Sequence, residues 1–312
     1  MTGSNTSLAD VKQEYKRNWS KYNPSLVRRI EVLMDTSFLD RWKEDLEREN
    51  EGKVGRPYEY PQEFFVFLSK VRSLWNVPFR ELEAFVRNLS KLTGKFRPLS
   101  YVAIFQRIGS IHIYGIMEEI NKDAKDGITV IIDSSVFKIT DRGDWLSSKW
   151  NRKRKGWIKM HVAIDGDTMN IVSLSITDEH SHDSREFRKI LSPIADKVKM
   201  VYWDGAYDSR GNFNFLYSKG IEAVIPPREN SSTLPRGSPY MAMIVRSIRK
   251  EGIEEWKREM NYGKRWSVEI FFSALKRVVG ETIRARKLIY QIHEAVMKIY
   301  CYFILRKNTV VS

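Results

Sequence analysis

The spacing of hydrophobic and polar residues changes once along the chain, close to residue 127. Before that point apolar residues recur at helical intervals, as at Leu82, Phe85, Val86 and Leu89, which is the pattern of amphipathic helices. After it, short apolar runs and alternating segments appear between helical stretches, which indicates strands. We therefore expect an α/β protein, in which an N-terminal all-helical part precedes a mixed sheet flanked by helices.

Helical periodicity divides the N-terminal part into short segments. Predicted helices cover residues 23–34, 36–49, 61–75, 79–92 and 99–108, with breaks at Val77-Pro78 and at residues 93–98. Three short helices with tight breaks are compatible with a helix-turn-helix unit, whose last helix enters the major groove of DNA. Tyr101, Gln106 and Arg107 are then the candidates for contacts with bases or phosphates. A plain helical cap over the second part remains the alternative.

The part after residue 127 has strands and helices in the order βββαβαβα. An apolar run at residues 128–132 predicts a strand buried on both faces. Alternation at 158–164 and 172–176, around the turn signal Asp165-Gly166, predicts a hairpin. Further strands are expected at 199–203 and 221–225, and helices at 184–191, 209–219, 239–260 and 262–276.

Two aspartates follow directly after predicted buried strands. Asp133 closes the run ITVIID, and Asp204 closes the run KMVYWD. A carboxylate at the C-terminal end of such a strand projects into the crevice where open α/β sheets bind ligands. The alternative for each acid is an ordinary turn residue or helix cap.

A third acid lies in the segment Tyr262–Lys276, which predicts a helix. On a helical wheel Arg265, Glu269 and Lys276 share one face, beside an apolar face made by Val268, Phe272, Leu275 and Val279. Ordinary charge pairing at i,i+4 is the simpler explanation of this face. Together with Asp133 and Asp204, however, Glu269 completes a set of three carboxylates. Converging carboxylates need a counter-charge, and we expect Mg²⁺ or Mn²⁺, as two ions that clamp the attacking and leaving oxygens of a phosphodiester.

The same segment carries a longer motif, Y-x2-R-x3-E-x6-K, formed by Tyr262, Arg265, Glu269 and Lys276. With this motif the chain resembles a DDE transposase of a prokaryotic insertion sequence. The resemblance extends over roughly residues 50–305 and includes the stretches GRPYEYP, FRELEAF, VIIDSS, WDGAYDSRG, AVIPPREN and RARK.

This resemblance implies an RNase H-like catalytic domain with Asp133, Asp204 and Glu269 as the metal-binding triad. It also implies that Tyr262, Arg265 and Lys276 hold the DNA backbone at the end being cut. We expect a tail at residues 1–20 that is mobile, a helical DNA-binding domain at 21–126 and the catalytic domain at 127–312. The partners implied are double-stranded DNA, as transposon ends and target, and a second copy of the chain, since two ends must be joined.

Positive charge is concentrated beside the predicted acids. The chain has 53 basic and 39 acidic residues, and its net charge of +14 comes from residues 138–159 and 256–307. A focused positive surface is typical of phosphate binding. Lys149, Arg152, Lys153, Arg154 and Lys155 lie in the first of these segments and are expected to contact the DNA backbone.

The remaining composition gives fewer indications of function. Cys301 is the single cysteine, so no disulfide framework is expected. The N-terminal residues lack the apolar core of a secretory signal, and no apolar run has the length of a membrane span. We expect a cytoplasmic protein with access to DNA, no membrane association and no nucleotide cofactor.

Several other polar residues have simpler explanations. His180 and His182 with Asp178 and Asp183 could form a metal site, but Asp183 is better explained as a helix cap paired with Glu186. His161 is predicted to be a core or cleft histidine, and Asp208 a helix cap. Trp157 and Trp266 are candidates for stacking on an unpaired base.

Two other functions remain open from the sequence. One is a different nuclease on the same fold, acting on DNA junctions or RNA–DNA hybrids. The other is a DNA-binding regulator derived from a transposase. The focused basic segment and the separate helical part argue against the first, and the intact acids argue against the second.

Overall fold

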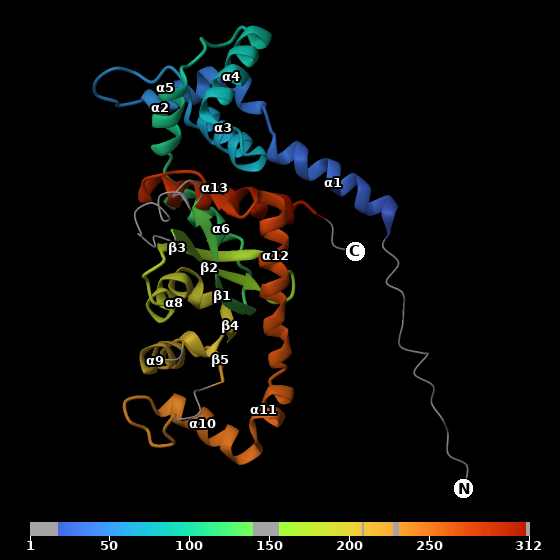
Figure 1. Cartoon of the computed structure of the whole chain (residues 1–312), viewed down its shortest axis with the longest axis vertical. Helices are drawn as coiled ribbons and strands as arrows, with labels where there is room; N and C mark the ends of the chain where they lie inside the picture. Colours follow the sequence, from blue (N-terminus) through green and yellow to red (C-terminus); the bar gives the residue numbers. More distant parts are fainter. Residues whose placement is uncertain (1–17, 140–155, 208, 227–230, 310–312) are drawn as a thin grey trace, which may run out of the picture.

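A mixed β-sheet forms the centre of the molecule (Figure 1). The computed structural model describes residues 18–139, 156–207, 209–226 and 231–309. Within these ranges the strands are β1 (Ile128–Ile139), β2 (Trp157–Asp165), β3 (Ile171–Asp178), β4 (Val198–Tyr202), β5 (Glu222–Val224) and β6 (Thr282–Ile283). The sheet has the order β3-β2-β1-β4-β5, and β6 pairs with the far end of β1.

Strand direction follows from the lengths of the connections. The short turn after Asp165, closed by the bond from its N–H to the Asn170 carbonyl at 2.8 Å, makes β2 and β3 antiparallel. By contrast, β4 and β5 run parallel to β1, because helices carry the chain back across the sheet. The antiparallel β1–β2–β3 meander followed by parallel strands confirms the predicted RNase H-like sheet flanked by helices.

Helices cover both faces of the sheet. The elements after β3 are α8 (Asp183–Leu191), η2 (Ser192–Lys197), η3 (Gly205–Tyr207), α9 (Arg210–Ser218), α10 (Pro239–Glu251), α11 (Ile253–Glu259), η4 (Tyr262–Trp266), α12 (Ser267–Val279) and α13 (Leu288–Lys307). Both α8 and α13 contact β2, whose residues from Met160 to Asp165 are all buried. This strand is therefore covered on both faces, although its alternating sequence predicted only half-burial.

The N-terminal helices pack on α13 and form one continuous hydrophobic core with the sheet. They are α1 (Trp19–Leu33), η1 (Ser37–Leu39), α2 (Trp42–Asn50), α3 (Gln62–Trp75), α4 (Phe79–Thr93), α5 (Tyr101–Gly109) and α6 (Ile113–Lys122). In Figure 1, α13 crosses between the layer of α2–α5 and the sheet. Polar contacts also join them, among which Arg72 pairs with Glu294 at 3.4 Å and the Tyr300 hydroxyl donates to Glu119 at 2.8 Å.

Several helices differ from those predicted, and the helix expected at 36–49 is a 3-10 turn at Ser37–Leu39 followed by α2 from Trp42. The first helix begins at Trp19, because Asn18 caps it, and Pro24 lies inside it rather than at its start. The helix α6, which contacts β3 and α13, was not predicted. The segment expected as one helix at 239–260 is divided by Gly252, whose φ of 90° interrupts helical geometry. The predicted division into domains at residue 126 remains a prediction, and the predicted tail lies almost entirely outside the described residues.

The long helix α13 is buried along most of its length, including the polar residues Glu294 and Lys298. In the described part of the chain, no helix combines the length and the apolarity that crossing a membrane requires.

The apolar face of α12 should determine how firmly this helix is held. Leu275 is completely buried on that face, whereas Ile270 is 62% exposed on the same helix. We expect Leu275→Ala to lower the free energy of unfolding by about 2–5 kcal/mol, because it leaves a cavity. Ile270→Ala should change this free energy by no more than about 0.5 kcal/mol. Urea denaturation of both variants measures the difference, and equal effects would show that α12 is not anchored through this face.

Candidate active site

Asp133 and Asp204 lie just beyond the last residue pair between β1 and β4. That pair is Ile131 with Tyr202. Asp133 follows two residues later on β1, and Asp204 follows two residues after β4 ends. The prediction that Asp133 ends its strand is wrong, since β1 continues to Ile139 by pairing with β2 and β6. The carboxylate nevertheless lies where the parallel pairing stops and the sheet opens, which is the position that the prediction required.

The motif segment is not one continuous helix. Residues Tyr262–Trp266 form a 3-10 turn, and α12 begins only at Ser267. Contacts with the sheet hold the turn, because the Tyr262 hydroxyl donates to the Trp203 carbonyl at 3.2 Å and Lys264 pairs with Asp167 at 2.5 Å. These tertiary contacts, preceded by a left-handed Asn261 with φ 48°, override the helical periodicity. Glu269 lies in the first turn of α12, and its side chain is 47% exposed.

Arg265 connects two of the three acids. One guanidinium nitrogen lies 3.5 Å from a carboxylate oxygen of Asp133, and another lies 3.5 Å from a carboxylate oxygen of Glu269. The Arg265 side chain is only 16% exposed, and its Nε atom is buried without a hydrogen-bond partner among the described residues. The structure therefore places a cation between carboxylates that would otherwise repel each other.

The acids affect one another electrostatically. Burial raises the pKa of Asp133, and the charges of Asp204 and Glu269 raise it further, whereas the Ser134 N–H and Arg265 lower it. Burial also raises the pKa of Tyr262 to about 12, so its phenol is protonated at neutral pH. The site thus combines three carboxylates, one buried guanidinium and one neutral hydroxyl donor.

A second cluster of polar side chains contacts the chain beside Asp133 and Asp204. His161 on β2 is completely buried, with Nδ1 3.3 Å from the Tyr207 hydroxyl and Nε2 3.1 Å from the Thr177 hydroxyl. Asp183 accepts a bond from the Ser134 hydroxyl at 3.4 Å and pairs with Lys159. Because Ser134 follows Asp133 directly and the Tyr207 N–H donates to the Asp204 carbonyl at 3.1 Å, the cluster holds the backbone of both aspartates.

The prediction that Asp183 caps α8 is therefore wrong. The N-cap is His182, which makes no side-chain capping bond, and Asp183 turns inward to Lys159. The roles of Ser134 and Tyr207 were not predicted, although both lie within three residues of a predicted catalytic acid. That proximity was the available sequence signal. Within the described ranges no group of three or more His, Cys, Asp or Glu side chains is arranged to hold a metal ion. This finding covers His180 and His182, and it also covers Asp133, Asp204 and Glu269, whose carboxylates are not gathered into a ready metal site in this structure.

The other predicted site residues lie apart from the three acids or outside the residues that the structure describes. Lys276 is half-buried on α12. Tyr101, Gln106 and Arg107 lie on α5, in the layer beyond α13 (Figure 1), and the Arg107 guanidinium is held 4.8 Å from the rings of both Tyr58 and Phe65. The following predicted residues lie outside the described residues: Lys149, Arg152, Lys153, Arg154, Lys155 and Asp208.

The chemistry of the acid set fits a hard divalent cation. All three side chains offer carboxylate oxygens, the ligands that Mg²⁺ and Mn²⁺ prefer. Arg265 already contacts two of them, which shows that this space accepts positive charge.

Comparison with known proteins gives a consistent family. A family model described as a transposase DDE domain matches residues 124–304, more than half of the chain, and a second model with the same description matches residues 27–142. Among solved structures, the chain is similar to the piggyBac transposase synaptic complex with hairpin DNA, with 10% identity, a TM-score of 0.43 and coverage of 91% of this chain and 75% of that one. It is also similar to a pre-cleavage Mos1 transpososome, with 8% identity, a TM-score of 0.24 and coverage of 83% and 82%.

The buried histidine below the acids should make stability depend on pH. Burial lowers the pKa of His161 from 6.5 to about 4, so between these values the unfolded chain binds a proton that the folded protein does not. Stability should therefore fall as pH falls through this window, with a slope of up to about 1.4 kcal/mol per pH unit from this group. His161→Gln should reduce the dependence.

The measurement is urea denaturation at pH 6.5 and at pH 4 for the wild type and the variant. His180→Gln serves as the control, because the His180 side chain is 83% exposed in the loop before α8. A pH dependence that is identical in wild type and His161→Gln would assign it to other groups.

Proposed function

This chain belongs to the family of transposases with a DDE domain, and from that premise we propose that it cuts the ends of its own mobile element and joins them to target DNA. The observation that carries the proposal is the contact of Arg265 with both Asp133 and Glu269 at the open edge of the sheet, where the charge of Asp204 also raises the pKa of Asp133. Carboxylates that interact electrostatically beside a mostly buried cation are the chemistry expected for metal-dependent phosphodiester cleavage.

Asp133, Asp204 and Glu269 would hold Mg²⁺ or Mn²⁺, as one or two ions. When bound, such ions supply Lewis-acid stabilisation of the scissile phosphate and lower the pKa of the attacking water. The protein's own part is to fix the ligands. Asp133 is fixed by the β1–β2 ladder and by Ser134, and Glu269 by the packing of α12.

Two displacements at phosphorus account for the proposed reaction. Water attacks the phosphodiester at the element's end, the P–O bond to the 3′ oxygen breaks, and a 3′-hydroxyl and a 5′-phosphate result. The 3′-hydroxyl then attacks a phosphodiester of target DNA in the same site, forming one P–O bond as another breaks. Neither step consumes a nucleotide cofactor or forms a covalent bond to the protein.

Three residues of the motif would position the DNA strand. Arg265 offers a planar guanidinium suited to two phosphate oxygens. Lys276 offers an ammonium group about two helical turns after Glu269 on α12. Tyr262 offers a neutral hydroxyl donor. The basic segment at residues 149–155 and α5 would add contacts along the duplex, and the joining of two ends implies a homodimer in the DNA-bound state. We infer a cytoplasmic setting from the need to reach DNA.

The acids should be required for cleavage and not for DNA binding. Asp133→Asn, Asp204→Asn and Glu269→Gln should each reduce metal-dependent cleavage to background, while the dissociation constant for DNA changes little. The substrate is duplex DNA from inverted repeats that flank the gene, in Mg²⁺ or Mn²⁺ buffer. Asp196→Asn is the control, because the Asp196 side chain is 88% exposed and pairs with Lys219 at the surface.

Retention of cleavage by one acid variant in saturating metal would remove that residue from the triad. Loss of DNA binding together with cleavage in all three would point to a structural role. Cleavage of junctions or RNA–DNA hybrids in preference to repeat ends would favour a different nuclease on this fold.

Lys276 should affect the chemical step more than its neighbour does. Lys276→Ala should lower the rates of strand cleavage and joining by about 10- to 100-fold, because a displaced strand end no longer lies in line for attack. Arg277→Ala removes the same charge from the adjacent, exposed position on α12 and should leave both rates nearly unchanged. Single-turnover rates on pre-bound DNA measure the comparison. Equal rates in the two variants would make Lys276 an ordinary surface cation.

A further inference from the structure

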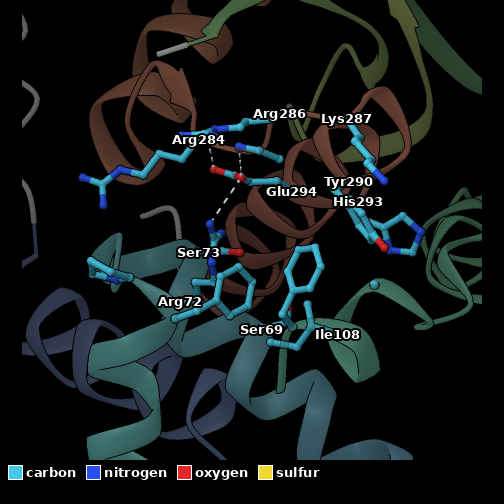
Figure 2. A pocket seen from close by; sticks show the side chains of 15 residues that line it. Ser69, Arg72, Ser73, Ile108, Arg284, Arg286, Lys287, Tyr290, His293 and Glu294 are labelled. Atoms are coloured by element: carbon cyan, nitrogen blue, oxygen red, sulfur yellow. Dashed lines mark hydrogen bonds and ion pairs between the residues drawn. The ribbon is translucent and has the colours of Figure 1, made fainter. Parts of the chain in front are cut away.

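A cavity of about 500 Å³ lies between the N-terminal helices and the beginning of α13 (Figure 2). Its lower walls come from α3, α4 and α5, and its upper wall comes from residues 284–287 and the first two turns of α13. The volume falls within the range of about 300–1,000 Å³ that is usual for small-ligand sites.

One side of the cavity is aromatic. Phe79 on α4, Phe105 on α5 and Tyr290 on α13 line it, with ring centroids 5.2 Å apart for the first pair and 4.6 Å apart for the second. All three rings are partly exposed rather than sealed in the core. The backbone of Gly109 borders Tyr290 so closely that a methyl group at Gly109 would overlap the tyrosine ring. The rings are inclined to one another by 89° and 54°, so together they offer a planar ligand both ring edges and ring faces.

The other side of the cavity is basic. Arg72, Arg284, Arg286 and Lys287 line it, and Glu294 is the one acid among the described lining residues. Several of these groups already have partners. Glu294 accepts the N–H groups of Arg284 at 3.0 Å and Ala285 at 3.1 Å and pairs with Arg72, while the Arg284 guanidinium donates to the Asn76 carbonyl at 2.8 Å. Four basic residues against one carboxylate leave this wall positive, which suits an anion.

Two buried polar atoms beside the cavity have no hydrogen-bond partner in the described part of the chain. They are Nδ1 of His293, a residue that is only 8% exposed, and Nε of Arg72. Figure 2 shows His293 next to Tyr290 on the cavity side of α13. Buried polar groups are normally satisfied, so atoms left without a partner at a cavity point to a bound molecule that satisfies them. Burial lowers the pKa of His293, which leaves a neutral ring able to donate or accept one bond.

We propose that this cavity binds one unpaired nucleotide of DNA, with the base against the aromatic wall of Phe79, Phe105 and Tyr290 and the phosphate at the exposed basic residues Arg286 and Lys287. This proposal rests on the proposed function and adds one further DNA contact to it. The aromatic and basic walls together suit a ligand in which a planar aromatic group is joined to an anion. A free mononucleotide has this chemistry as well. A nucleotide within a strand is favoured because the basic wall is exposed at Arg286 and Lys287, where a backbone can continue outward.

The cavity is separate from the carboxylates. Residues 284–287 follow β6, which pairs with β1 at Lys138 and Ile139. Asp133 lies five residues earlier on the same strand, about 17 Å away at the rise of a β-strand. The nucleotide in the cavity is therefore not the one that carries the scissile phosphate.

The test uses the full-length protein and duplexes of one sequence. One duplex is fully paired, and the others carry a single unpaired 2-aminopurine as a bulge or as an overhang. We expect the unpaired forms to bind about 5- to 100-fold more tightly than the paired form, with quenching of 2-aminopurine fluorescence by stacking. Tyr290→Ala and Gly109→Ala should both remove this preference, the second by displacing the tyrosine ring.

Two matched controls separate the cavity from general effects. Gly115→Ala makes the same change in α6, where the nearest atom lies 3.7 Å from the new methyl, and should keep the preference. Lys287→Gln should weaken binding of the unpaired form more than Lys250→Gln does, since Lys250 is exposed on α10 at the opposite end of the molecule (Figure 1).

Equal affinity for paired and unpaired DNA, or a preference that survives in Tyr290→Ala, would overturn the proposal while leaving the proposed function intact. Deoxyadenosine monophosphate is tested directly. If it binds with the same dependence on Tyr290 while unpaired DNA gains nothing, the ligand is a free nucleotide and the assignment to DNA is wrong. Absence of all DNA binding and of metal-dependent cleavage would instead reject the proposed function, and the cavity assignment with it.

Discussion

Mutual repulsion among Asp133, Asp204 and Glu269 is the constraint on which this structure depends. Burial and the charges of the other two acids all raise the pKa of Asp133. The Ser134 N–H opposes this rise, and so does a fixed positive charge beside the carboxylate. Arg265 supplies it, and the surrounding fold holds Arg265 in place. The 3-10 turn that carries this residue is tied to β4 through Tyr262 and to the β2–β3 turn through Lys264.

The helix that follows is held at both ends. At its start, Glu269 meets Arg265; at its end, Lys298 of α13 donates to the carbonyl of Val279. A cation at a helix C-terminus meets the negative end of the helix dipole. Lys298 is completely buried, and this burial lowers its pKa. Its side-chain nitrogen also contacts the Asn76 side-chain oxygen at 3.5 Å. Because Asn76 ends α3, the same lysine joins α12 to the N-terminal helices.

Local periodicity was enough to predict most elements of the fold. Strands β1 to β5 follow from apolar runs and from alternation, and the buried face of α12 follows from apolar residues at intervals of three and four. Predictions failed where a distant contact decides the local structure. Asp183 has the spacing of a helix cap, but Lys159 and Ser134 draw it inward. Asp133 has the appearance of a strand end, but pairing with β2 and β6 extends the strand.

The candidate site shows the same division. Three acids and Arg265 could be selected from the sequence because strand ends and helical spacing place them near each other. The support beneath them could not, since His161, Thr177 and Tyr207 come from three elements that meet only in the folded sheet. The cavity beside α13 is also a product of tertiary packing. Its aromatic wall combines residues from positions 79, 105 and 290, which no sequence pattern relates.

The three acids and part of the cavity lie on the same or directly connected elements, so a DNA molecule that contacts both would meet them at a fixed spacing. Asp133 and the β6 pairing lie on one strand, β1, while α12 leads from Glu269 to β6 and then to residues 284–287. Residues 284–287 of the basic wall are therefore fixed relative to the carboxylates. Arg72, Phe79 and Phe105 line the cavity from the N-terminal helices instead. The 3.4 Å pair between Arg72 and Glu294 joins these helices to α13 at the cavity. A shift of α3–α5 relative to α13 would thus change the width of the cavity without moving the carboxylates.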